Sequence, residues 1–566
     1  MMEGFDYVIV GGGSSGCVLA ARLSENPSVR VCLIEAGGRD RHPLIHMPVG
    51  FAKMTAGPMT WGLTTAPQKH ANNREIPYAQ ARVLGGGSSI NAEVYTRGHP
   101  RDYDRWVEEG ADGWSFQEVK PYFLRSEGNT ILSGEWHGTD GPLGVSNLPD
   151  PQPMTRAFVQ SCQELGIPYN PDFNGPVQEG AGVYQTTIRN SRRCSAAVGY
   201  LRPALARKNL TLITGALVLR IVFQGRRAVG VEYSTGSAAK IARAESEVLV
   251  TSGAIGTPKL MMLSGVGPAA SLQSHGIDVV QDMAGVGQNL HDHFGVDIVA
   301  ELKGHDSLDK YNKLHWMFLA GIEYALFKSG PVASNVVEGG AFWYGDRASP
   351  YPDLQFHFLA GAGAEAGVPS VPKGSSGVTL NSYTVRPKSR GSVTLRSADP
   401  RALPIVDPNF LEDPDDLRIS VEGIRISREI FGQPSLQKYI RTIRFPDENV
   451  RTQADFEAYA RQYGRTSYHP TCTCKMGRDD MSVVDPQLRV HGLDGIRICD
   501  SSVMPSLVGS NTNAATIMIG EKAADLIRVT FDREAVMEGS RHSLTNVLLS
   551  RGWAEDFSLL SNRRSR

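Results

Sequence analysis

The chain has 566 residues and a formal net charge of −1, with 58 Lys and Arg against 59 Asp and Glu. This balance excludes a protein that binds nucleic acid through its overall charge, and the length predicts two large domains or more. Hydrophobic residues make up 41% and charged residues 21%, as in ordinary soluble proteins. No apolar run of about 18 residues is present, so we expect no transmembrane helix.

Seven cysteines are spread over the chain. The first strand of the protein is expected to begin at Phe5. That strand leaves no room for a secretory leader, and an odd number of dispersed cysteines favours free thiols, so we expect a reducing cytoplasm. Cys472 and Cys474 resemble a metal-binding pair only in their spacing, because no second ligand pair lies near them. We therefore predict no metal site.

The N-terminal segment predicts a dinucleotide site. A strand of β-branched residues leads into the pattern G-x-G-x-x-G, which is formed by Gly11, Gly13 and Gly16. An alanine-rich helix pattern follows, and a second strand at 29–34 ends at Glu35. Glycines let backbone N–H groups approach a pyrophosphate, and an acid about 20 residues further on accepts hydrogen bonds from a ribose. The alternative is a glycine-rich turn in another kind of α/β unit.

A second glycine-rich segment follows at 82–91 and ends in Ser88-Ser89-Ile90-Asn91. It predicts a backbone cradle against the flat face of a ligand, and the alternative is a close-packed turn. Before it, residues 39–67 are expected to be irregular. After it, the pattern at 103–127 predicts a helical insert.

Strand-like runs return in the middle of the chain, at 210–214, 218–223, 228–233 and 246–251. Ser252-Gly253-Ala254 and a helical pattern follow the last run, which indicates a doubly wound sheet returning to the nucleotide. The β-rich runs at 353–358, 381–386 and 392–395 predict strands of a different, antiparallel sheet. Residues 360–377 predict a loop, either an exposed connection or an active-site lid.

The last third of the chain carries two polar segments. Tyr468-His469-Pro470 comes first, and Asn511-Thr512-Asn513 then opens an apolar helix at 514–527. Such a run before a helix presents caps and N–H groups to anionic or carbonyl atoms. After residue 529 the composition becomes charged and rich in Ser, which predicts a tail at 531–566 that is disordered or lightly docked.

Together these segments resemble the glucose–methanol–choline (GMC) family of flavin oxidoreductases over roughly residues 5–529. Five of its patterns occur in the family's order. They are the first glycine motif with Glu35-Ala36-Gly37-Gly38, L-G-G-G-S-S-I-N at 84–91, G-A-I-G-T-P-K-L-M-M-L-S-G-V-G at 253–267, the run at 285–293, and the pair His469 and Asn511.

The resemblance implies an α/β plus α+β fold with a discontinuous, Rossmann-like FAD-binding domain and a substrate domain built on an antiparallel sheet. We expect residues 1–300 to form mainly the FAD domain with helical inserts, and 301–465 mainly the substrate domain. Residues 466–530 would return to the FAD domain with the catalytic pair.

The resemblance also implies FAD rather than NAD. Glu35 would hold the adenosine ribose, Val218 the adenine, and the segment at 13–15 the pyrophosphate. The implied cofactor-binding residues are Gly11, Gly13, Ser14, Ser15, Gly16, Glu35, Ala36, Trp61, Val83, Gly86, Gly87, Ser88, Asn91, Ala92, Val94, Val218, Asp500, Ser501, Thr512 and Asn513. Some relatives attach FAD through a His in S-S-H-N, and Ile90 at that place predicts non-covalent FAD.

For catalysis the resemblance implies His469 as the base and Asn511 as the partner that orients the hydroxyl group. An alcohol loses a proton from oxygen and a hydride from carbon, and flavin N5 takes the hydride. Histidine suits the proton step because its ordinary pKa lies nearest neutrality. His291 and His293 suggest a metal pair, but their segment joins two domains in the family, so we expect them to be structural.

The sequence says less about the substrate than about the cofactor and the catalytic residues. Glu338 corresponds to an acid that meets a cationic head group in choline-oxidising relatives, and the alternative is a buried acid satisfied by its neighbours. Tyr468 is expected to border the pocket. Because aromatic residues are too sparse there for a quaternary-ammonium cage, we favour a neutral primary alcohol.

The electron acceptor stays open between O₂ and a quinone or artificial acceptor, and a homo-oligomer is compatible with the sequence. Alternatives for the function are a lyase or light-driven decarboxylase without net redox turnover, and a membrane-associated, choline-dehydrogenase-like protein whose tail docks to a partner or lipid surface.

Overall fold

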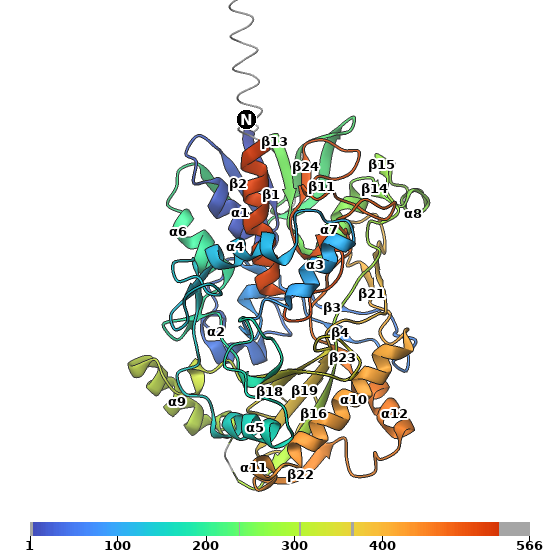
Figure 1. Cartoon of the computed structure of the whole chain (residues 1–566). Coiled ribbons are helices and arrows are strands. Elements are labelled where there is room, and N and C mark those ends of the chain that lie inside the picture. Colours follow the sequence, from blue (N-terminus) through green and yellow to red (C-terminus); the bar gives the residue numbers. More distant parts are fainter. Residues whose placement is uncertain (1–3, 237, 305–306, 364–366, 531–566) are drawn as a thin grey trace, which may run out of the picture.

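A computed structural model describes residues 4–236, 238–304, 307–363 and 367–530 (Figure 1). The predicted tail at 531–566 lies outside the described residues. Two large sheets organise the described part of the chain, and each has its own apolar core.

The first sheet has the strand order β10-β2-β1-β13-β12-β11, and β24 pairs with β13. The pairs β10–β2, β2–β1, β1–β13 and β13–β24 are parallel, whereas β12 and β11 continue antiparallel. Its strands are β1 (Gly4–Val10), β2 (Val31–Glu35), β10 (Leu210–Thr214), β11 (Leu217–Gln224), β12 (Arg227–Ser234), β13 (Ala239–Val250) and β24 (Ile496–Ile498).

β1 and β2 consist mainly of β-branched and other apolar residues that are buried on both faces, as central parallel strands require. Figure 1 shows α1 (Ser14–Leu23) and the red helix at 513–530 beside these strands. The parallel strands end at one edge of the sheet. Gly11, Glu35, Thr251 and Cys499 come at or just after those ends, so the strand order gathers them there.

The second sheet is antiparallel throughout, in the order β22-β16-β19-β18-β17-β7, with β23 paired to β16. Its strands are β7 (Gly180–Val183), β16 (Phe294–Leu302), β17 (Val337–Trp343), β18 (Leu354–Leu359), β19 (Gly377–Thr384), β22 (Ile440–Phe445) and β23 (Arg465–Thr466). Helices α5 (Pro153–Glu164), α10 (Pro414–Phe431) and α12 (Gln453–Tyr463) contribute to its core.

The remaining elements are short. The helices are α2 (Pro43–His46), α3 (Pro100–Glu108), α4 (Phe116–Ser126), α6 (Arg202–Ala204), α7 (Gly253–Leu263), α8 (Ala269–Ser274), α9 (Leu314–Phe327) and α11 (Pro434–Gln437). The tighter or wider helical turns are η1 (Pro48–Lys53), η2 (Gly86–Ser89), η3 (Ala197–Leu201), η4 (Leu308–Asn312), η5 (Pro331–Ala333) and η6 (Ser501–Val503). The two-stranded ribbons are β3 (Leu63–Thr64) with β4 (Pro77–Tyr78), β5 (Glu127–Asn129) with β6 (Leu143–Val145), β8 (Ile188–Arg189) with β9 (Arg192–Arg193), β14 (Val266–Gly267) with β15 (Gln281–Asp282), and β20 (Ser392–Thr394) with β21 (Ile405–Asp407).

The helical insert predicted at 103–127 is present as two helices, α3 and α4, separated by a turn in which Gly110 and Gly113 have positive φ. Two expectations need correction. The strand predicted at 392–395 does not join the second sheet, because it pairs with β21 as β20. The second sheet also takes β7 from residues 180–183, within the range assigned to the FAD domain. The exact domain boundaries stay a prediction.

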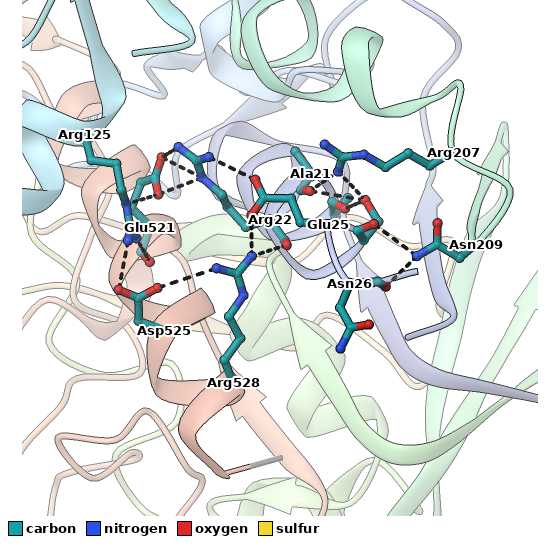
Figure 2. A network of polar contacts seen from close by, with 12 residues as sticks. Ala21, Arg22, Glu25, Asn26, Arg125, Arg207, Asn209, Glu521, Asp525 and Arg528 are labelled. Carbon is teal, nitrogen blue, oxygen red and sulfur yellow. Dashed lines mark hydrogen bonds and ion pairs between the residues drawn. The ribbon is translucent and has the colours of Figure 1, made fainter. Parts of the chain in front are cut away.

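A buried polar network ties the two ends of the described chain together (Figure 2). Glu521, on the helix at 513–530, accepts hydrogen bonds from Arg22 of α1 at 2.8 Å and from Arg125 of α4 at 2.8 Å. Tyr200 donates a further bond to it at 2.7 Å, and the Glu521 side chain is fully buried. Arg528 reaches back to Glu25 at 2.6 Å. The network clamps the C-terminal helix onto α1, whose N-terminus follows the first glycine motif.

Candidate active site

A cavity lies where the carboxyl ends of the parallel strands face the second sheet. The first sheet and its loops contribute Gly11, Gly13, Glu35, Val218 and Thr251 to its wall, among others. The opposite wall includes Val337, His357, Leu359 and Asn381 of the second sheet. Ligands of open α/β sheets bind at such strand ends, so the cavity is the candidate site.

The first glycine motif shows why each glycine is needed. Gly11 has φ +107°, in the left-handed region that favours glycine. A Cβ on Gly16 would lie 2.0 Å from the carbonyl oxygen of Gly11, so this glycine permits α1 to pack against β1. Gly13 faces the cavity, and a Cβ there would meet nothing closer than 3.8 Å. Its bare backbone is therefore open to a ligand.

The second glycine segment packs directly on the first. The N–H of Gly85 donates to the carbonyl oxygen of Gly12 at 2.7 Å. A Cβ on Gly86 would lie 2.7 Å from the Cα of Gly13. The two segments, more than 70 residues apart in the chain, form one continuous backbone surface along the cavity.

Glu35 ends β2 at the cavity wall. Its carboxylate accepts the N–H of Gly12 at 2.7 Å and the N–H of Gly37 at 2.6 Å. Burial raises the pKa of Glu35, although these two bonds oppose the shift. Each oxygen keeps a second lone pair that could accept from a ligand hydroxyl.

Most residues predicted to hold the cofactor line this cavity. They are Gly11, Gly13, Ser14, Ser15, Glu35, Ala36, Trp61, Gly86, Gly87, Asn91, Ala92, Val94, Val218, Asp500, Ser501, Thr512 and Asn513. Gly16, Val83 and Ser88 are not among the lining residues. Gly16 packs the helix, and the Ser88 hydroxyl donates to the carbonyl oxygen of Gly85 at 2.6 Å.

His469 and Asn511 meet at the same cavity. The Nδ2 atom of Asn511 lies 3.3 Å from Nε2 of His469, and both residues line the wall. The Oδ1 atom of Asn511 accepts from Gln355 at 3.0 Å and from Thr96 at 3.2 Å. These two donors fix the amide so that Nδ2, a donor, faces the imidazole. Tyr468, with φ +63°, lines the cavity beside them.

His293 orients the imidazole of His469 through a hydrogen bond to its Nδ1. Its Nε2 lies 3.0 Å from the carbonyl oxygen of Val385, and its Nδ1 lies 2.9 Å from Nδ1 of His469. A carbonyl oxygen only accepts, so Nε2 of His293 carries the hydrogen and its Nδ1 is a bare acceptor. Nδ1 of His469 must then be the donor. We infer from this chain of bonds that Nε2 of His469 is unprotonated and faces Asn511 and the cavity.

Burial, followed by the neighbouring His357, lowers the pKa of His469 to about 3. His357 has its own pKa lowered to about 3, chiefly by burial, and its Nε2 lies 3.1 Å from Gln355 and 3.2 Å from Tyr383. Both imidazoles are therefore neutral near neutral pH. His469 is therefore in the neutral form, and its bare Nε2 is the ring nitrogen that can accept a proton.

Asp292 holds the loop that carries His469. The N–H of His469 donates to Oδ1 of Asp292 at 2.8 Å, while Tyr78 donates to its Oδ2 at 2.6 Å. Thr466 donates to the same Oδ2. Burial raises the pKa of Asp292 to about 6. Neither Asp292 nor His293 was predicted as a site residue, and only the motif at 285–293 could have drawn attention to them.

Glu338 does not line the cavity. Its carboxylate accepts from the Gln152 N–H at 2.7 Å, from Thr155 at 2.7 Å and from Ser334 at 2.6 Å. Glu338 lies at an irregularity in the pairing of β17 with β18, between Val337 and Gly339, and its carboxylate reaches Thr155 of α5, whereas Val337 lines the cavity. The alternative of a buried acid satisfied by its neighbours describes this arrangement, and substrate contact does not.

His291 and His293 do not point at a common centre. His291 bonds to Asn289 at 3.1 Å and accepts the N–H of Leu507 at 3.3 Å, whereas His293 faces His469. Cys472 and Cys474 are buried free thiols. Within the described ranges, His, Cys, Asp and Glu form no cluster of three or more that could hold a metal ion.

The N-terminal family model "GMC oxidoreductase" matches residues 5–295, and the C-terminal model of the same name matches residues 387–520. The chain belongs to the GMC oxidoreductase family. It is 43% identical to an alcohol dehydrogenase [acceptor] of Pseudomonas putida, over 92% of this chain and 95% of that protein. An oxygen-dependent choline dehydrogenase of Brucella anthropi is 42% identical over the same shares of the two chains.

Among solved structures, the chain resembles a pyridoxine 4-oxidase from Mesorbium loti, with a TM-score of 0.84 and 29% identity over 92% of this chain and 98% of that one. The GMC family is a family of flavoproteins, so the cavity must suit a flavin. The bare backbone at Gly13, the joined glycine segments and Glu35 at the strand end fit the phosphate and ribose of such a group.

Proposed function

We propose that this GMC oxidoreductase binds FAD without a covalent bond and oxidises primary alcohols to aldehydes. The observation that carries the proposal is the half-buried, neutral His469, whose Nε2 faces the cavity beside Asn511. The dehydrogenases and the oxidase named above support redox chemistry over the lyase and decarboxylase alternatives.

Glu35 would receive the adenosine ribose, the segment at 13–15 the pyrophosphate, and the segment at 86–94 the flavin ring, with Thr512 and Asn513 at its pyrimidine end. The apolar Ile90, a lining residue, has no nucleophile that could attach the ring, which supports dissociable FAD. When bound, the flavin accepts the hydride at N5. The first sheet then forms the FAD domain and the second sheet the substrate domain.

The chain's own residues would perform the proton step. Asn511 Nδ2–H donates to the substrate oxygen, while Nε2 of His469 accepts the hydroxyl proton as the hydride leaves carbon. His293 keeps the other hydrogen of His469 on Nδ1, so the imidazole does not rotate its acceptor away from the substrate. Both His469 and Asn511 are half-buried in the cavity wall, so a bound flavin and alcohol would displace water from them.

The substrate side of the cavity favours a neutral alcohol. Its lining of Val337, Leu359 and Asn381 is apolar or neutral, and the Arg465 guanidinium is paired with Asp297 at 2.7 Å. A quaternary ammonium group would find Glu338 turned away. Choline is the second candidate because of the choline dehydrogenase relatives, and direct comparison of choline with neutral alcohols of similar size distinguishes the two.

Across the described residues no helix combines the length and apolarity needed to cross a lipid bilayer. We place the enzyme in the cytoplasm, and its seven cysteines, all buried as free thiols, support a reducing compartment. O₂ and a quinone are both candidate acceptors.

His469→Ala tests the proposal. The variant should keep bound, yellow FAD and lose flavin reduction by alcohol, by on the order of 100-fold to 10,000-fold, because the acceptor of the hydroxyl proton is gone. Anaerobic stopped-flow absorbance measures the reduction. Tyr169→Phe, at a 55% exposed position outside the cavity lining, serves as the control. Wild-type rates in His469→Ala would refute the role of His469.

A further inference from the structure

α9 is an apolar helix that the described part of the chain leaves largely uncovered. It connects β16 to β17, with η4 before it and η5 after it. The exposed fraction is 76% for Leu314, 67% for Phe318, 69% for Leu326 and 72% for Phe327. Figure 1 shows α9 at the edge of the molecule. Soluble monomers rarely expose so much contiguous apolar surface, so this helix points to a binding partner.

Most of the circumference of α9 is exposed, since residues 314–319, 321–322 and 325–327 are all exposed. Leu314, Phe318, Ile322 and Leu326, which are four residues apart, form an apolar row on the outward side. The inner face carries Ala320, which is buried, and Tyr324, whose hydroxyl donates to the carbonyl oxygen of Ser191 at 2.8 Å. α9 is therefore fixed to the protein along one side and presents leucine, isoleucine and phenylalanine on the other.

Lysines flank both ends of this apolar face. Nζ of Lys310 lies 5.0 Å from the ring centroid of Tyr311 and 5.6 Å from that of Trp316. At the other end, Nζ of Lys328 lies 5.0 Å from the ring centroid of Tyr324, and Lys313 is exposed beside Leu314. Lysine side chains can lie along apolar surface while their ammonium groups reach lipid headgroups, and the polar edges of aromatic rings suit a membrane–water interface.

A second copy of the chain fits this face poorly. Two α9 helices packed antiparallel would bring Lys313 of one copy near Lys328 of the other, and parallel packing would bring each lysine near itself. Both arrangements set like charges together. Anionic lipid headgroups instead complement the lysines, and the acyl region accepts the apolar side chains.

We propose that α9 docks the enzyme to an anionic lipid surface, lying in the plane of the interface. Glu323, the acid within α9, lies half-buried on the inner side, where Ser329 donates to it at 3.5 Å, so it does not oppose docking. With 14 residues the helix lies on the membrane and does not span it.

α9 is connected through η4 to residues that form the wall of the active-site cavity. Leu308 and Tyr311 of η4 belong to an apolar cluster that also contains Phe51 and Val337. Phe51 and Val337 line the cavity. Docking through α9 would therefore bring this side of the cavity next to the lipid.

Vesicle flotation of the full-length holoenzyme tests the proposal, with vesicles of phosphatidylcholine alone and vesicles that contain one quarter phosphatidylglycerol. Wild type should float with the anionic vesicles, and added salt should weaken the binding. The double variant Phe318→Ser/Leu326→Ser should lower the affinity by on the order of tenfold or more, because it removes apolar area from the interface.

The matched control is Ile131→Ser/Val177→Ser, since these side chains are 60% and 58% exposed elsewhere on the surface. For the charges, Lys313→Glu/Lys328→Glu should reduce binding, and Lys208→Glu/Lys240→Glu, also at exposed positions, should not.

Failure of wild type to float with anionic vesicles would overturn the proposal. So would equal flotation of the α9 variant, or a wild-type dimer in sedimentation equilibrium that the α9 variant converts to monomer without any lipid binding. Lipid binding by α9 does not depend on the chemistry of the cavity, so it can fail while the alcohol oxidation holds.

Discussion

At the scale of single residues, the hydrogen bonds that fix the tautomer of His469 are the reason why we propose this imidazole as the base. The backbone carbonyl of Val385 accepts from Nε2–H of His293, which leaves Nδ1 of His293 as an acceptor. This acceptor in turn fixes the hydrogen of His469 on its Nδ1. A sequence displays His293 only as one of two histidines in a short run. Its role depends on a contact with a residue 176 positions away, and no local pattern reports such a contact.

His293→Leu removes the acceptor for Nδ1–H of His469. We expect flavin reduction by alcohol to slow by on the order of 100-fold, with the FAD spectrum unchanged, because the base loses its fixed tautomer. His293→Gln retains an amide oxygen as acceptor and should recover part of the rate. Stopped-flow absorbance measures the rate of flavin reduction by alcohol in both variants. Equal losses in the two variants, matched by equal losses of melting temperature, would mean that His293 is merely structural.

His137 gives a pH-dependent prediction for stability. Burial lowers its pKa, but the hydrogen bonds that its ring N–H groups donate to Asp172 and Glu127 outweigh burial and raise the pKa to about 9. The folded pKa lies above the unfolded value of about 6.5, so the contribution is full below about pH 6.5 and disappears as the pH rises through about 9. Melting temperatures of wild type and His137→Gln should thus differ most below about pH 6.5 and converge toward about pH 9. A difference that grows with pH would contradict this assignment.

At the scale of elements, much of the site follows from sequence patterns. The strand before Gly11 and the helix after Gly16 are present as β1 and α1, and the predicted strands at 210–251 match β10 to β13. One strand was predicted in the wrong sheet, and one strand of the second sheet was not predicted. β20 pairs outside the second sheet, and β7 comes from residues 180–183, because strand partners depend on contacts distant in sequence. The apolar run of α9 was visible in the sequence, but whether a helix is covered depends on its neighbours.

The polar network around Glu521 holds the helix at 513–530 against α1 (Figure 2). Glu521→Ala would leave the buried Tyr200 hydroxyl without its acceptor, while Arg22 keeps Glu25 and Arg125 keeps Asp525 as partners, so we expect a loss of about 1–3 kcal/mol in the free energy of unfolding. Asp150→Asn breaks the exposed ion pair with Arg156 and should cost less than about 1 kcal/mol. Urea unfolding of the two variants measures both. Similar small losses would show that the network does not hold the C-terminal helix on α1.

At the scale of the whole molecule, function depends on two sheets that meet across one cavity. The parallel sheet gathers glycines and Glu35 at its strand ends, while the antiparallel sheet supplies Val337, His357 and Asn381 opposite them. His469 and Asn511 come from segments that return to the first sheet late in the chain. This arrangement sets the proposed base where a flavin and an alcohol would meet.

The most direct test of the central claim is an anaerobic absorbance titration of the purified holoenzyme with a panel of neutral primary alcohols and choline, followed by admission of air. We predict that neutral alcohols bleach the flavin bands and yield aldehyde, and that choline does so less effectively. The rate at which colour returns in air then separates an oxidase from a dehydrogenase. A flavin that dithionite bleaches but that no alcohol reduces would contradict the account.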